Sequence, residues 1–149
     1  MFNDFDFTDF WQGSLYARET YVEGAITPDL IASVELELGF RLPAAYVALM
    51  RVQNGGIPSR TCFLTTQSTT WAEGHVQISG IFGIGREKPC ALLGAQGSKF
   101  MQAEWGYPTF GICIGDCPSA GHDMIMLDYR VAPRASRAWC MSIRSAAMP

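Results

Sequence analysis

Residues 110–130, FGICIGDCPSAGHDMIMLDYR, hold two apolar runs on either side of a polar segment. The runs, at 110–114 and 124–127, have the length and the Ile, Phe and Leu content that strands favour. Between them, residues 115–123 are rich in Gly, Asp, Pro and Ser, which are the residues that turns use. This stretch therefore predicts an antiparallel β-hairpin with a long loop.

The chain before this hairpin begins with segments that predict helices. The best defined runs from Thr27, a typical N-cap, through Pro28 to Gly39, a typical C-terminal stop. A further helix is expected from Pro43 to Met50, ended by the sequence NGG at 54–56. The N-terminal third of the chain is thus expected to be helical.

An earlier helix is predicted over 7–16 by apolar residues at the spacing of one helix face. These residues are Phe7, Phe10, Trp11, Leu15 and Tyr16. Beyond residue 56 the pattern changes to β-prone runs at 62–64 and 76–84, whereas 91–102 fits either a short helix or a loop. Helices followed by strands predict an α+β fold with N-terminal helices packed on a mainly antiparallel sheet. The length of 149 residues suits a single domain over 1–149.

The composition argues against a general nucleic-acid binder. The chain is 48% hydrophobic and has a net charge of −3, whereas binding to phosphates needs a basic face. The start, MFNDFDFTDFW, carries aspartates where a signal peptide carries basic residues, and no run of about 18 apolar residues suggests a membrane span. We therefore expect a cytoplasmic protein, and a basic partner suits its charge.

The five cysteines predict reduced thiols. They stand at 62, 90, 113, 117 and 140, an odd number without a CxxC pair. This pattern fits neither a disulfide framework nor a structural zinc site.

The hairpin loop brings together residue types that could do chemistry. Cys117, His122 and Asp123 offer a thiol, a base and a carboxylate, and Cys113 would add a metal ligand. The spacing matches no zinc pattern, and catalytic triads are usually assembled from distant segments. The other reading is a turn, in which the aspartates at the two loop ends bond backbone amides and Gly121 takes a positive φ. We favour the turn.

Two further motifs have a structural reading. SGIFGIG (79–85) carries three glycines but matches neither GxGxxG nor GxxxxGK, so bends or close strand packing are expected. Asp128 ends an apolar run two residues before Arg130. A contact of this carboxylate with arginine or a backbone amide is favoured over acid-base catalysis.

Four blocks together are similar to one known family. They are LGFRLPAAYVALMRVQNGG (38–56), WAEGHVQISGIFGIGRE (71–87), EWGYP (104–108) and GDCPSAGHDMIMLDYR (115–130). With their spacing, which covers 27–130, they resemble the SUKH superfamily, which includes the yeast Smi/Knr cell-wall-synthesis regulators and many bacterial immunity proteins. The resemblance implies N-terminal helices against a mostly antiparallel sheet. It also implies a binding protein without a cofactor, not an enzyme.

The resemblance further implies a partner. Bacterial members typically neutralise a cognate toxin, often a nuclease, by stoichiometric binding. The yeast members suggest an alternative, a regulatory adaptor of cell-wall or glucan synthesis. An acidic protein suits a basic nuclease, because opposite potentials speed association.

The expected contacts are aromatic and acidic residues of the last three blocks, although EWGYP fits core and turn as well as interface. They are Trp71, Glu73, Glu104, Trp105, Tyr107, Asp116, His122 and Asp123.

The tail after Arg130 departs from the family pattern. Family members usually continue with Gly, Glu-Pro and a valine-rich strand, whereas this chain reads VAPRASRAWCMSIRSAAMP. Our hypothesis is that 131–149 is a frameshifted reading of that segment, because synonymous codons exist that turn VAPRASRAWCMSIRSA into GPQGEPRVVHVDQER. A missing strand would then leave a sheet edge uncovered. The alternative is a divergent tail that packs through Trp139, Met141 and Ile143. Sequencing the gene decides: codons that yield no such string would end the hypothesis.

Overall fold

The computed structural model describes residues 2, 4–66, 68, 73–130 and 141–145, the last five through their backbone. These residues form four helices and six strands. In chain order they are α1 (Leu15–Thr20), α2 (Pro28–Leu38), α3 (Ala44–Val52), β1 (Cys62–Leu64), β2 (His75–Gln77), β3 (Gly80–Ile81), α4 (Ser98–Trp105), β4 (Gly111–Asp116), β5 (Asp123–Asp128) and β6 (Met141–Ser145).

A four-stranded sheet in the order β3-β4-β5-β6 forms the centre of the fold, and all its neighbouring strands are antiparallel. β4 and β5 are the predicted hairpin, with Ile112 opposite Leu127. Their register shifts between Cys113 and Gly115, which marks a β-bulge. All six residues of β5 are buried, so this strand lies in the core.

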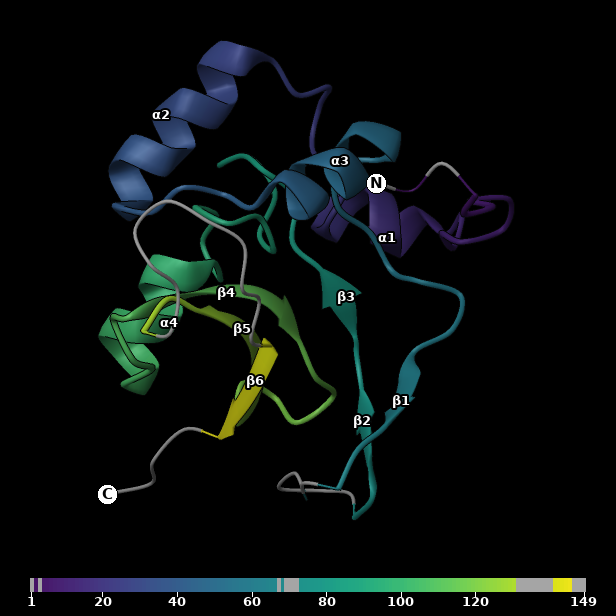
Figure 1. Cartoon of the computed structure of the whole chain (residues 1–149), viewed down its shortest axis with the longest axis vertical. Helices are drawn as coiled ribbons and strands as arrows, with labels where there is room; N and C mark the ends of the chain where they lie inside the picture. The colour runs from purple at the N-terminus through teal and green to yellow at the C-terminus, as the bar shows by residue number, and fades with distance from the viewer. Residues whose placement is uncertain (1, 3, 67, 69–72, 131–140, 146–149) are drawn as a thin grey trace.

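The remaining strands, β1 and β2, form a separate antiparallel ribbon. In Figure 1 this ribbon extends away from the three N-terminal helices, and β2 leads almost directly into β3. Phe63 and Leu64 of β1 have exposed fractions of 63% and 86%. β1 therefore adds little to the core, whereas Val76 of β2 is buried in it.

The predicted limits of the second helix are confirmed in α2. The Thr27 hydroxyl accepts a hydrogen bond from the Leu30 amide, Pro28 is the first helical residue, and Gly39 ends the helix with a φ of 77°. The α3 helix begins after Pro43, as predicted, and extends to Val52. Local capping chemistry therefore decides where these helices begin and end.

The prediction of a helix over 7–16 was wrong in its bounds. α1 begins after Ser14, whose hydroxyl accepts a hydrogen bond from the Ala17 amide. Before it, Asp9 has a φ of 56° and Trp11 forms an antiparallel bridge with Pro58, and neither fits a continuous helix. The periodic rings contact one another instead, from Phe5 to Trp11. The spacing that predicted a helix face therefore belongs to an aromatic cluster at the surface.

The segment 91–102, which fitted either a short helix or a loop, contains a loop followed by the start of a helix. Its first part is a loop that folds back on itself, because a Cβ on Gly94 would lie 2.0 Å from the carbonyl oxygen of Lys88. The α4 helix follows from Ser98 and ends at Gly106, which has a φ of 69°.

One hydrophobic core joins the helices to the sheet. It includes Tyr21, Val34 and Met50 from the helical part and Met124 from β5. The Tyr46 hydroxyl of α3 donates a hydrogen bond to the carbonyl of Phe82, just beyond β3. In Figure 1 the first three helices gather at one end of the sheet, and α4 lies beside β4 and β5. The predicted α+β fold is confirmed.

The described part of the tail is β6, which pairs with β5 from Asp123 opposite Ser145 to Leu127 opposite Met141. The edge of β5 is therefore covered by a strand. Trp139, through which the divergent tail was expected to pack, lies outside the described residues.

Candidate binding surface

The structure places the predicted contact residues in different surroundings. Glu73 is exposed just before β2, and Glu104 is exposed near the end of α4. Trp105, Asp116 and His122 are half-buried. Tyr107 and Asp123 are buried, with exposed fractions of 2% and 0%, so in this structure they support the surface from beneath. Trp71 lies outside the described residues.

Trp105, Tyr107 and His122 come together at the loop between β4 and β5. The rings of Trp105 and His122 meet edge to face, with their centroids 5.4 Å apart. The Tyr107 hydroxyl donates a 2.8 Å hydrogen bond to the carbonyl of Gly121. Gly121 has a φ of 94°, as the turn reading predicted, and a Cβ there would lie 3.1 Å from the Trp105 ring. We call Glu104, Trp105 and His122 the loop patch.

Asp116 takes part in a different contact. Its carboxylate accepts hydrogen bonds of 3.0 and 3.1 Å from the Tyr21 hydroxyl, which comes from the end of α1. Burial raises the pKa of this carboxyl to about 6. Hydrogen bonds from Tyr21 and from the backbone amides of Asp116 and Gly80 oppose part of that rise. These bonds agree with the turn reading. Asp116 thus ties β4 to the N-terminal helices.

The thiol of Cys117 is poorly suited to nucleophilic catalysis. Burial, together with the charges of Asp123 and Asp116, raises its pKa to about 12. The His122 ring packs on Trp105. Among the residues that the structure describes, no three His, Cys, Asp or Glu side chains gather as a metal site would require. The loop is therefore organised as a turn.

Two buried polar residues that sequence reasoning missed hold the end of the SGIFGIG segment and the residues just after it. Asn54 binds both backbone groups of Ile84, with its Oδ1 accepting at 2.7 Å and its Nδ2 donating at 2.9 Å. Glu23 accepts hydrogen bonds from the amides of Glu87 and Lys88 at 2.7 and 2.9 Å. The signal for Asn54 was present in the NGG sequence, which was read only as a helix stop.

The glycines of this segment allow the close approach that was predicted. A Cβ on Gly80 would lie 2.2 Å from the Tyr21 ring, and one on Gly83 would lie 2.5 Å from the carbonyl oxygen of Asn54. A Cβ on Gly85 would lie 2.4 Å from the Glu23 carboxyl carbon. Any side chain would therefore push the segment off the helices.

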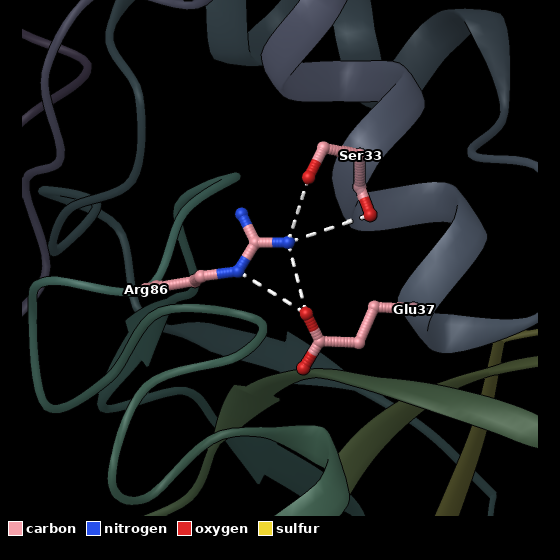
Figure 2. Close-up of polar contacts among 3 residues, drawn as sticks. All are labelled: Ser33, Glu37 and Arg86. Atoms are coloured by element: carbon pink, nitrogen blue, oxygen red, sulfur yellow. Dashed lines mark hydrogen bonds and ion pairs between the residues drawn. The ribbon is translucent and has the colours of Figure 1, made fainter.

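Arg86 fastens the loop after this segment to α2. Its Nη2 donates hydrogen bonds to the Ser33 hydroxyl and to Glu37, both at 2.9 Å, and its Nε bonds Glu37 at 3.2 Å (Figure 2). These groups are partly exposed, so the ion pair contributes less than about 1 kcal/mol. Its effect is to orient the loop.

At the other end of the sheet the predicted contact of Asp128 with Arg130 is confirmed. The Arg130 backbone amide and Nε each donate to Oδ1 of Asp128 at 3.0 Å. The guanidinium carbon also lies 3.9 Å from the centre of the Phe110 ring. One arginine is thus held by a carboxylate and an aromatic face together.

None of the helices in the described ranges is long and apolar enough to cross a membrane. Comparison with known proteins adds one match. A model of the SMI1 / KNR4 family (SUKH-1) matches residues 25–141, which include every element from α2 to β5. No curated protein and no solved structure matches the chain. The segment before residue 25, with α1 and the aromatic cluster, lies outside the family match.

Proposed function

Because the chain belongs to the SMI1/KNR4 family (SUKH-1), we propose that it is an immunity protein that binds and blocks a cognate toxin in the cytoplasm. The observation that carries this proposal is the family match over most of the chain. The proposed action is stoichiometric occlusion, which needs neither a cofactor nor a catalytic residue. The proposed target is a basic nuclease domain.

The loop patch supports a binding role. The rings of Trp105 and His122 are half-buried and in contact, Glu104 is exposed next to Trp105 in the chain, and the Tyr107 hydroxyl binds the loop through Gly121. Aromatic residues fixed by a rigid scaffold are common anchors of protein interfaces, because they bury much area at little cost in side-chain entropy. We propose this patch as part of the contact surface, with Glu73 as a further contact on the ribbon.

The charge also fits a basic target. A net charge of −3 attracts a protein that is itself built to bind nucleic acid, and such attraction speeds association. It fits less well with direct binding to nucleic acid or to an anionic membrane. We therefore propose a protein partner.

The test begins by recovering the partner. The tagged full chain is isolated from a lysate of its own source, and co-purifying chains are identified by mass spectrometry. The toxin domain found there is then purified and its activity is titrated with this protein. We expect the unaltered protein to inhibit the toxin completely at one equivalent. The Trp105→Ala variant should need a larger excess to reach the same inhibition.

Two outcomes would contradict the proposal. Recovery of cell-wall or glucan-synthesis enzymes in place of a toxin would support the adaptor role that the family's yeast members suggest. A toxin domain that remains fully active at excess immunity protein would exclude neutralisation by binding.

A further inference from the structure

The N-terminal segment carries an aromatic cluster that is separate from the core. Phe2, Phe5, Phe7 and Phe10 contact one another edge to face or tilted, with ring centroids between 4.7 and 6.1 Å apart. The buried core and its partly buried neighbours include Trp11 but none of these four. Their apolar surface is therefore not needed to hold helices to sheet.

Carboxylates alternate with these rings. Asp4, Asp6 and Asp9 are exposed, and the Phe5 side chain between the first two has an exposed fraction of 50%. A hydrogen bond from Thr8 lowers the pKa of Asp6 below its usual value, so this group stays ionised at neutral pH. We call Phe2 and residues 4–10 the aromatic-acidic segment.

The segment is fastened to the domain at its C-terminal end. The Ser59 amide donates to the carbonyl of Phe10 at 2.8 Å, and its hydroxyl donates to the carbonyl of Asp9 at 2.6 Å. The Gln12 amide donates to the carbonyl of Ile57 at 2.8 Å. These bonds fix the C-terminal end of the segment, which reduces the entropy lost when a partner binds.

A carboxylate beside an aromatic face is a site for arginine, and the same molecule contains an example. Arg130 donates to the carboxylate of Asp128 while its guanidinium lies over the Phe110 ring. The guanidinium suits this pair because it is planar, always charged and weakly hydrated. In the sequence of the aromatic-acidic segment, aspartates alternate with aromatic residues, and the rings are partly exposed.

We propose that the aromatic-acidic segment is a docking surface for an arginine- and lysine-bearing face of the partner protein. This inference rests on the proposed function and names a second contact surface beside the loop patch. A second copy of this chain would set carboxylates against carboxylates, and nucleic acids and anionic membranes are repelled. The segment precedes residues 25–141, which match the family model.

The test measures affinity of the full chain for the purified toxin domain by calorimetry, at low and at high salt. Two variants alter the segment: Phe5→Ala removes the most exposed ring, and the pair Asp4→Asn and Asp6→Asn removes charge without changing shape. Matched controls lie on other exposed sites, with Leu36→Ala for the ring and the pair Asp29→Asn and Glu87→Gln for the charge.

We expect Phe5→Ala to weaken binding about tenfold and the charge pair to weaken it about five- to tenfold, with a smaller salt dependence. The controls should stay within about twofold of the unaltered chain. Equal affinities for segment variants and controls would overturn the docking surface while leaving the immunity function intact.

A second probe separates the two proposals. It is a synthetic peptide of alternating arginine and leucine, compared with one of alternating glutamate and leucine. Binding of the arginine peptide that both segment variants weaken would support the surface even if no toxin is recovered. Binding of neither peptide, or of both alike, would contradict it.

Discussion

The indole of Trp105 stands at 90° to the imidazole of His122, with the ring centroids 5.4 Å apart. The contact joins the last residue of α4 to the loop between β4 and β5. Two separate sequence blocks thereby form one surface. The contact also explains why the loop needs glycine at 121, since a Cβ there would press on the indole at 3.1 Å.

Replacing Trp105 by alanine should weaken toxin binding about tenfold or more, because it removes the aromatic anchor of the loop patch. The matched control is Leu36→Ala, which removes an apolar side chain with an exposed fraction of 85% on α2. This control should change the free energy of unfolding by no more than about 0.5 kcal/mol and leave affinity unchanged. Unaltered binding by Trp105→Ala, measured by calorimetry, would remove the loop patch from the interface.

Asp116 should make stability fall as pH rises through the weakly acidic range. Burial raises the pKa of its carboxyl to about 6 in the folded protein, above its usual value of 3.8. The folded state therefore binds the proton more tightly than the unfolded state does. The stability that protonated Asp116 contributes is complete below about pH 4 and is lost as the pH rises through about 6. Asp116→Asn should remove about 2 kcal/mol of this pH dependence. Urea unfolding from pH 4 to 7 measures it, and identical pH profiles would refute this assignment.

Gly80→Ala should destabilise the fold by about 3 kcal/mol, because the new Cβ would lie 2.2 Å from the Tyr21 ring. The ring cannot move away without breaking its hydrogen bonds to Asp116. Gly24→Ala is the control, since nothing lies within 4 Å of a Cβ there, and its stability should change by no more than about 0.5 kcal/mol. Equal urea midpoints for the two variants would show that the segment can move.

Thiol labelling of the native protein should distinguish the cysteines. Cys62 is exposed, whereas Cys90, Cys113 and Cys117 are buried and have pKa values raised to about 12 by burial. A thiol reagent at neutral pH should modify Cys62 at least about tenfold faster than these three. Peptide mapping by mass spectrometry gives the rate at each site. Rapid modification of Cys117 would support the catalytic reading of Cys117, His122 and Asp123 over the turn.

Helix caps and apolar spacing predicted much of the fold. They failed in the N-terminal segment, where the aromatic residues pack on one another and not on the core. The limits of α2 followed from Thr27 and Gly39, whose capping roles act within a few residues. The helix predicted over 7–16 was wrong because Phe7 and Phe10 pack on neighbouring rings. Spacing alone cannot show whether a stripe of aromatic residues faces a core or a surface cluster.

The candidate surface was only partly accessible from the sequence. The blocks around EWGYP and the hairpin loop contained its residues, but nothing local distinguished Trp105 at the surface from Tyr107 beneath it. The hydrogen bonds of Asn54 and Glu23 were also missed, because they join residues that are distant in the sequence. Their partners, Ile84 and the amide of Glu87, lie 30 and 64 residues away along the chain.

The sequence by itself determined the limits of α2, the change from helices to strands and the hairpin at 110–130, because caps, turns and strand patterns are properties of neighbouring residues. The family followed from the resemblance of four sequence blocks. Only the tertiary structure decided which predicted contacts reach solvent and which brace them. It also decided that Asp116 binds Tyr21 and that the rings of residues 2–10 gather outside the core. Burial and hydrogen bonding depend on segments that are distant in the sequence and adjacent in the fold. A local sequence pattern does not show which segments become neighbours.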